Sequence, residues 1–166
     1  MLWIRAAIFT ILVPGVVAAW TPWWLLHSSH EVRAFDPGLG RWAGLALALA
    51  GVAGYVLCAL DFLLKGGGTP SIFFTRHLRF LLGEEPRLVV QQGLYRYSRN
   101  PMYLSVVAVI LGEGVFFGSA TVLLYGLAAF VFFHLVVVLL EEPHLRRKGG
   151  DSYREYCRRT PRWLLK

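Results

Sequence analysis

The segment between residues 93 and 103, GLYRYSRNPMY, contains the residue types needed to bind an anionic group. Asn100 and Pro101 predict the start of a helix, because asparagine suits the N-cap and proline is tolerated at the first helical position. The free N–H groups and the positive dipole end of a helix start can hold a carboxylate. Arg99 adds a forked donor for carboxylate or phosphate. An interfacial cap beside a snorkelling arginine is the alternative interpretation.

A second polar group, Glu141-Glu142-Pro143, follows the last apolar block of the chain. Two carboxylates at the end of a helix are unfavourable, because the dipole there prefers cations. Pro143 disfavours helical geometry at Glu142, so we expect the chain to turn at this point. The two carboxylates could accept hydrogen bonds from sugar hydroxyls or hold a cation. An ion pair with Arg99 or Arg96 is the alternative, and it is compatible with a functional role.

The remaining polar residues inside apolar blocks give weaker signals. Glu113 lies between two glycines in the third block, where a carboxylate is costly, and its role stays open. We interpret the flanking glycines as helix-packing positions. His134 is interpreted as a satisfied buried histidine. The sequence has no P-loop, HExxH, GxSxG or zinc-spaced Cys/His cluster, so it predicts no metal site.

Composition excludes an ordinary soluble enzyme and a disordered chain. Of the 166 residues 56% are hydrophobic and 16% are charged, and the mean hydropathy is +0.52. Soluble domains have roughly 45–50% apolar and 25% charged residues. The net charge of +7 gathers in segments 65–100 and 141–166. This pattern fits the positive-inside bias of membrane proteins better than nucleic-acid binding, and it predicts no nucleic-acid partner.

The elements that must position these residues are membrane-spanning helices. A span needs about 20 mostly apolar residues, and four blocks qualify. They cover about residues 2–26, 42–64, 101–117 and 120–140. The first block also resembles a signal peptide, but we expect a retained helix. The sequence therefore predicts an all-α polytopic membrane protein with one domain over 1–166, in which 1–64 form two N-terminal helices and 65–166 the catalytic core.

Four spans place both termini and both basic segments on one side, which the charge bias makes cytoplasmic. The short turn Gly118-Ser119 predicts an antiparallel hairpin of the third and fourth blocks. Its register brings Arg99 close to the Glu141–Glu142 pair. Segment 71–83 is expected to be an interfacial or re-entrant helix.

The basic tail is expected to contain one short helix. It runs over about 153–159 with Tyr153, Tyr156 and Cys157 on one face, and Pro161 ends it. Trp163 and the leucines after it are expected at the headgroup layer.

Three motifs together resemble a known group of enzymes. They are GLYRYSRNPMYL at 93–104, the glutamate pair at 141–142, and YREYCRRTPRWL at 153–164. Their combined spacing resembles the membrane methyltransferases of the isoprenylcysteine carboxyl methyltransferase and phospholipid methyltransferase group. The resemblance covers about residues 66–165. It implies a polytopic α-helical enzyme that uses S-adenosylmethionine without a Rossmann domain.

The resemblance also implies a set of cofactor-binding residues, in three groups. They are Gly93, Leu94 and Tyr95; Arg99, Asn100, Pro101 and Tyr103; and Glu141 and Glu142. Arg99 suits the α-carboxylate of S-adenosylmethionine, the glutamates suit its ribose hydroxyls or ammonium, and the tyrosines suit its adenine or sulfonium. We expect Arg99, Tyr103 and Glu141 to act in catalysis by aligning donor and acceptor.

The sequence thus predicts methyl transfer from S-adenosylmethionine, with S-adenosylhomocysteine as product, at the cytoplasmic face of a prokaryotic inner membrane. The acceptor is a lipophilic molecule in the bilayer, either a phospholipid amine or an isoprenoid or prenylcysteine carboxylate. Asn100 replaces the histidine of the prenylcysteine branch, so the acceptor stays open, as does the oligomeric state. The alternatives are a thiol methyltransferase and a non-enzymatic scaffold or haem-binding protein that uses His27, His30 or His134.

Overall fold

The computed structural model describes residues 2–28, 35–66 and 91–164, and every regular element in these ranges is a helix. Three helices are long and apolar enough to cross a membrane: Trp3–His27, Gly40–Leu64 and Ala120–Arg159. Pro101–Phe117 is a shorter apolar helix. The predicted all-α polytopic architecture is therefore confirmed. The predicted interfacial segment 71–83 lies outside the described residues.

The first crossing consists of three joined pieces, α1 (Leu2–Thr10), the π-helical η1 (Ile11–Trp20) and α2 (Thr21–His27). Pro14 lies inside the wide turns of η1. A proline removes a backbone donor, and a π segment is one way in which a helix accommodates this. The Tyr125 hydroxyl donates to the carbonyl of Val17 over 2.9 Å, so a side chain from the fourth crossing satisfies this irregular stretch.

The helices α3 (Gly40–Asp61) and α5 (Pro101–Phe117) pack closely through glycines. A Cβ on Gly51 would lie 2.6 Å from the carbonyl oxygen of Ser105, and a Cβ on Gly44 would lie 2.7 Å from that of Gly112. A Cβ on Gly112 would lie 2.5 Å from the amide nitrogen of Ala48. The packing role predicted for the glycine beside Glu113 is confirmed, because only hydrogen atoms fit between these two backbones.

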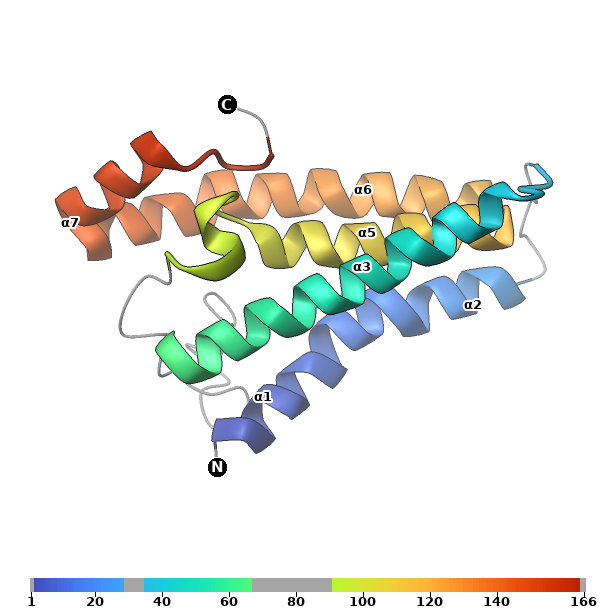
Figure 1. Cartoon of the computed structure of the whole chain (residues 1–166), viewed down its shortest axis with the longest axis horizontal. Coiled ribbons are helices and arrows are strands. Elements are labelled where there is room, and N and C mark those ends of the chain that lie inside the picture. The colour runs from blue at the N-terminus through green and yellow to red at the C-terminus, as the bar shows by residue number, and fades with distance from the viewer. Residues whose placement is uncertain (1, 29–34, 67–90, 165–166) are drawn as a thin grey trace.

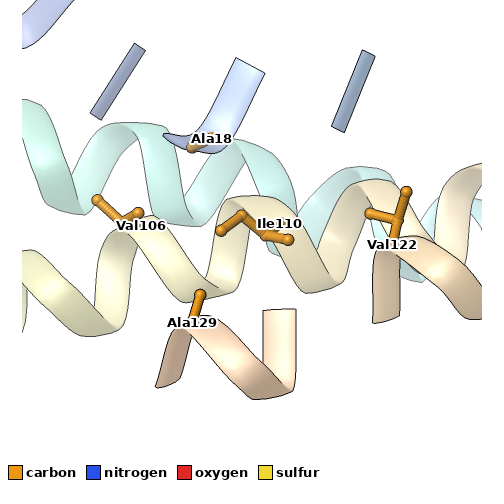
Figure 2. Close-up of a cluster of buried hydrophobic side chains, with 5 residues drawn as sticks. All are labelled: Ala18, Val106, Ile110, Val122 and Ala129. Atoms are coloured by element: carbon orange, nitrogen blue, oxygen red, sulfur yellow. The ribbon is translucent and has the colours of Figure 1, made fainter. Parts of the chain in front are cut away.

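The predicted hairpin is formed by α5 and α6 (Ala120–Val136). Gly118 has φ 65 and ψ 33, a left-handed conformation that favours glycine. The Ser119 hydroxyl then caps α6 by accepting a hydrogen bond from the amide of Val122 over 3.2 Å. Figure 2 shows the apolar core beside this hairpin, to which η1, α5 and α6 contribute side chains. Its buried members are Ala18, Val106, Ile110, Val122 and Ala129.

The expected turn at Pro143 is wrong. The chain continues from α6 through the π-helical η4 (Val137–Glu141) into α7 (Glu142–Arg159), and Glu142 has helical φ −60 and ψ −43. The amide of Glu142 donates to the carbonyl of Val137, so the wider turn places Pro143 in the first turn of α7, where its missing donor is tolerated. The backbone bends instead at Gly150, with φ 51 and ψ −131.

This bend decides where the chain goes after α7. In Figure 1, α7 lies at the same end of the bundle as the start of α1 and the start of α5, and the segment after α7 turns back along α6. We call residues 160–163 the return segment. The predicted short helix over about 153–159 is confirmed as the second part of α7, and Tyr153 and Tyr156 are both buried.

Candidate functional site

The short 3-10 helix η3 (Gly93–Arg96) leads into the start of α5. Gly93 has φ +60, and a Cβ there would collide with the carboxylate of Asp61 at the end of α3. Leu94 and the buried Tyr95 pack with Cys58 and Phe62 of the second crossing. The predicted Gly-Leu-Tyr group is therefore a tightly packed junction with α3 and η2 (Phe62–Gly66), in which only glycine fits at the first position.

The two predicted polar segments meet at this end of the bundle. The Arg99 Nη1 donates to Glu142 Oε1 over 3.0 Å, and the two residues are 43 positions apart in the chain. The side chains are only 11% and 6% exposed. The predicted convergence of Arg99 with the glutamate pair is confirmed.

The two adjacent glutamates have different partners. Glu141 is buried, and the hydroxyl of Tyr103 donates to its Oε1. The Tyr103 ring packs against Phe133 of α6, with ring centroids 4.8 Å apart. Glu142 is surrounded by arginines instead. The pair predicted as one unit therefore consists of one carboxylate bonded to a tyrosine and one that is ion-paired.

The predicted N-cap position of Asn100 is confirmed, but its side chain does not cap the helix. The Asn100 Nδ2 donates to the carbonyl oxygen of Arg162 over 3.0 Å, and the Ser98 hydroxyl donates to the same oxygen over 3.2 Å. This carbonyl of the return segment competes for the amide group of Asn100. Pro101 begins the helix as predicted, since the amide of Leu104 donates to the Asn100 carbonyl.

Arg162 is the residue that sequence reasoning missed. Its Nε donates to Glu142 Oε1 over 2.6 Å, and its Nη2 donates to Glu142 Oε2 over 3.0 Å. The hydrogen bond to Glu142 raises the pKa of the Arg162 guanidinium above its usual value. No local pattern marks Arg162 among the basic residues of the tail, and only the TPRWL part of the resemblance pointed to its neighbourhood.

Trp163 packs on α6, and its expected contact with the headgroup layer stays a prediction. Its Nε1 donates to Nδ1 of His134 over 3.1 Å, and its ring lies against Phe130 with centroids 5.0 Å apart. The interpretation of His134 as a hydrogen-bonded histidine is confirmed, but the residue is half-buried and not buried as expected. The indole thus attaches the return segment to the fourth crossing.

Arg99 has hydrogen-bonding capacity left over. Besides Glu142, its Nη1 contacts the Sγ of Cys157 at 3.0 Å. The Nε of Arg99 is buried and has no hydrogen-bond partner among the described residues. A buried donor without a partner is unfavourable unless a ligand supplies an acceptor. Arg99 is therefore the group at this site best suited to bind an anion.

Comparison with known proteins decides the family. The model of the phospholipid methyltransferase family matches residues 39–152. The chain belongs to the phospholipid methyltransferase family. It is also similar to protein-S-isoprenylcysteine O-methyltransferase of Schizosaccharomyces pombe, at 33% identity over 75 residues. That match covers 45% of this chain and 31% of the relative, so the chain spans about a third of the relative's length. No solved structure matches the chain significantly.

The phospholipid methyltransferase match includes η3, the start of α5, both glutamates and the first part of α7, but it ends at residue 152. The return segment lies beyond the matched region. The family resemblance proposed from the motifs is thus confirmed for the residues that carry Arg99, Tyr103, Glu141 and Glu142.

Two polar positions singled out in the sequence lie away from this site. His27 is exposed at the end of α2, and its Nδ1 lies 2.7 Å from the carbonyl oxygen of Trp23. Glu113 lies in the last turns of α5, and its Oε2 is buried without a partner among the described residues. No group of three or more potential metal ligands occurs within residues 2–28, 35–66 and 91–164.

Proposed function

We propose that this family member transfers a methyl group from S-adenosylmethionine to a lipophilic acceptor at the cytoplasmic face of the membrane. One observation carries the proposal: Arg99 and Tyr103 bond the buried carboxylates of Glu142 and Glu141 at one end of a largely apolar helical bundle. Polar side chains in such surroundings are expensive and are characteristic of function. The family match supports methyl transfer as that function.

The residues at the site fit the chemical groups of S-adenosylmethionine. The Nε–H of Arg99, which no described residue accepts, suits a carboxylate. Glu141 suits the ammonium group or the ribose hydroxyls, and Tyr103 holds this carboxylate in place. Glu142 contributes through Arg99, because arginines already bond both of its oxygens. Gly93, Leu94, Tyr95, Asn100 and Pro101 complete the proposed cofactor-binding set as the backbone and walls around these groups.

Such a site can promote methyl transfer by alignment. S-adenosylmethionine supplies a methyl group activated by its positively charged sulfur. Arg99 and Glu141 orient the donor from two sides, which removes much of the entropic barrier to an in-line displacement. The ring of Tyr103 presents a face that attracts positive charge. A carboxylate acceptor needs no general base, and an amine acceptor needs only to arrive deprotonated.

The cytoplasmic orientation is supported by the distribution of charge. The side chains of Arg146, Arg154, Arg158 and Arg159 on α7 are exposed at the end that carries the site. Exposed tryptophans occur at both ends of the first crossing, at position 3 at the end that carries the site and at positions 20, 23 and 24 at the other end, and Trp42 lies at that other end of the second crossing (Figure 1). Basic residues favour the cytoplasmic side and tryptophans favour the interfaces. A lipophilic acceptor would therefore reach the site from the inner leaflet.

Two acceptor classes remain within this proposal, a phospholipid amine and an isoprenoid or prenylcysteine carboxylate. The test is to reconstitute the purified protein in nanodiscs and add S-adenosylmethionine labelled with tritium in the methyl group. Phosphatidylethanolamine and a farnesylated cysteine derivative are offered separately as acceptors. We expect label in one organic-soluble product. A product that releases methanol in base is an ester, whereas a stable product is a methylated amine.

The proposal fails if neither these acceptors nor a total lipid extract is labelled and calorimetry detects no binding of S-adenosylmethionine or S-adenosylhomocysteine. Arg99→Gln is the matched negative control, because it removes the anion-binding group while Arg162 still neutralises Glu142.

A further inference from the structure

Arg162 is the principal ion-pair partner of Glu142, although it lies outside the region that matches the family. Its forked contact uses both carboxylate oxygens, at 2.6 Å and 3.0 Å. Arg99 reaches only one of these oxygens, at 3.0 Å, and the exposed Arg146 approaches the other at 3.5 Å. Two parallel bonds from a planar guanidinium are the strongest form of this interaction.

The backbone carbonyls of Pro161 and Arg162 accept hydrogen bonds from Arg99 and from its two neighbours in the chain. The amide of Arg99 donates to the carbonyl of Pro161 over 2.9 Å, and Ser98 and Asn100 share the carbonyl of Arg162. Trp163 anchors the following position on α6. The return segment therefore joins the start of α5 to α6, and the Arg162 side chain joins it to α7.

This arrangement limits what Arg99 can do with Glu142. A bidentate pair with Glu142 would use two nitrogens of Arg99, and the fork of Arg162 already holds the carboxylate. Arg99 makes a single bond to Glu142 and touches Cys157 with the same nitrogen, and it also interacts with the Tyr153 side chain. Its buried Nε has no partner in the part of the chain that the structure describes. Without Arg162, the nearest buried cation that could neutralise Glu142 completely would be Arg99 itself.

We propose that Arg162 is a positioning residue that neutralises Glu142 and thereby keeps Arg99 available for a carboxylate of the ligand. This inference rests on the proposed function, in which the carboxylate is that of the methyl donor. It assigns a role in the site to the return segment. It also predicts that removing Arg162 weakens ligand binding because Arg99 closes on Glu142.

The kinetic test compares Arg162→Gln, Arg162→Lys and the control Arg159→Gln in the full chain in nanodiscs. We expect Arg162→Gln to raise the KM for S-adenosylmethionine roughly tenfold or more and to change kcat little, because charge and fork are both lost. Arg162→Lys keeps the charge but loses the forked pair of donors, so its KM should lie between those of the wild type and Arg162→Gln. Arg159 pairs with Glu155 on the exposed side of α7, and its variant should stay within about twofold of wild type.

A second substitution separates positioning from a merely structural role. In Arg162→Gln combined with Glu142→Gln, Arg99 has no carboxylate on which to close. We expect the KM of the double variant to be lower than that of Arg162→Gln and closer to the wild-type value. Two substitutions that each only damage the site would instead raise the KM further when combined. A return segment that only supports the fold predicts that the double variant is at least as impaired as the single one. That result would overturn the proposal.

Cys157 provides a readout that does not depend on activity. Its Sγ contacts Arg99, whereas Cys58 is fully buried and serves as an internal reference. Alkylation by N-ethylmaleimide, followed by mass spectrometry, should accelerate several-fold at Cys157 in Arg162→Gln, because Arg99 moves to Glu142. In the double variant the rate should return towards wild type.

These measurements distinguish the two levels of the proposal. Absence of both methyl transfer and cofactor binding in the wild-type protein rejects the proposed function, while the alkylation rates still decide the role of Arg162. Equal alkylation of Cys157 in wild type and Arg162→Gln, or faster alkylation in the double variant than in the single one, overturns the role of Arg162. If the glutamine variant does not fold, Arg162→Lys with and without Glu142→Gln gives the same comparison.

Discussion

Helix α5 is held in two different ways along its length. Its middle packs on α3 through backbone-to-backbone contacts at Gly44, Gly51 and Gly112, where no added carbon fits. The residues just before its start, Arg99 and Asn100, are joined to α7 and the return segment by hydrogen bonds and an ion pair. The first region depends on the absence of side-chain atoms, and the second depends on matching charges and donors. A rigid apolar contact and a polar junction thus meet in one short helix.

The largest loss of stability is expected when the polar junction loses its central carboxylate. Glu142→Ala leaves the nearly buried Arg99 and the one-third-exposed Arg162 without their shared partner, and should cost about 3 kcal/mol. Titration with sodium dodecyl sulfate, followed by tryptophan fluorescence, measures this. Glu155→Ala on the exposed face of α7 is the control and should change stability by less than about 0.5 kcal/mol. Equal effects of the two variants would contradict the central role of Glu142.

A slightly smaller loss is expected at the glycine contact. Gly51→Ala adds a carbon 2.6 Å from the Ser105 carbonyl oxygen and 2.8 Å from the Val109 amide, so the helices must separate. The expected cost is about 1–3 kcal/mol, measured by the same titration. Gly40→Ala, where a Cβ meets nothing within 4 Å, should stay within about 0.5 kcal/mol of wild type. Similar stability of the two alanine variants would show that α3 and α5 are not in backbone contact.

Loosening the attachment of the return segment to α6 should cost less stability than the changes at the polar junction or at the glycine contact. Trp163→Phe removes the hydrogen bond to His134 but keeps an aromatic ring against Phe130, and should cost about 1 kcal/mol. Limited trypsin digestion measures the local effect, because cleavage after Arg162 requires this segment to open. Trp24→Phe alters an exposed indole at the opposite end of the bundle and is the control. Unchanged cleavage in Trp163→Phe would contradict the anchoring role of the indole.

The smallest change in stability is expected at Glu141. Glu141→Gln retains an acceptor for the Tyr103 hydroxyl, so the free energy of unfolding should change by less than about 1 kcal/mol. Methyl transfer should nevertheless fall roughly tenfold or more in kcat/KM, because the aligning charge is lost. Parallel loss of stability and activity would instead indicate a structural role for this carboxylate.

The sequence predicts well what depends on local patterns. Apolar blocks predicted the crossings, Gly118-Ser119 predicted the hairpin turn, and the hairpin register predicted that Arg99 meets the glutamate pair. The glycine beside Glu113 was correctly interpreted as a packing position. These predictions succeed because helix periodicity and turn chemistry involve neighbours in the chain.

The failures concern contacts that no local rule contains. Pro143 did not end its helix, because η4 accommodates it. Asn100 did not cap α5 with its side chain, because a carbonyl 62 positions later competes for the amide. In the sequence, nothing distinguishes Arg162 from the other arginines of the tail. Its contact with Glu142 depends on the backbone bend at Gly150, which returns the chain to that carboxylate. Separate partners for Glu141 and Glu142 likewise depend on tertiary packing.

The order of the elements has a consequence for biosynthesis. Arg162 follows all four apolar helices in the chain. The backbone must bend at Gly150 before Arg162 can reach Glu142. Helices emerge from the ribosome and enter the bilayer in sequence. A nascent chain can therefore have every helix inserted while Glu142 still awaits its main counter-ion, so this region should mature only after the last helix has left the ribosome.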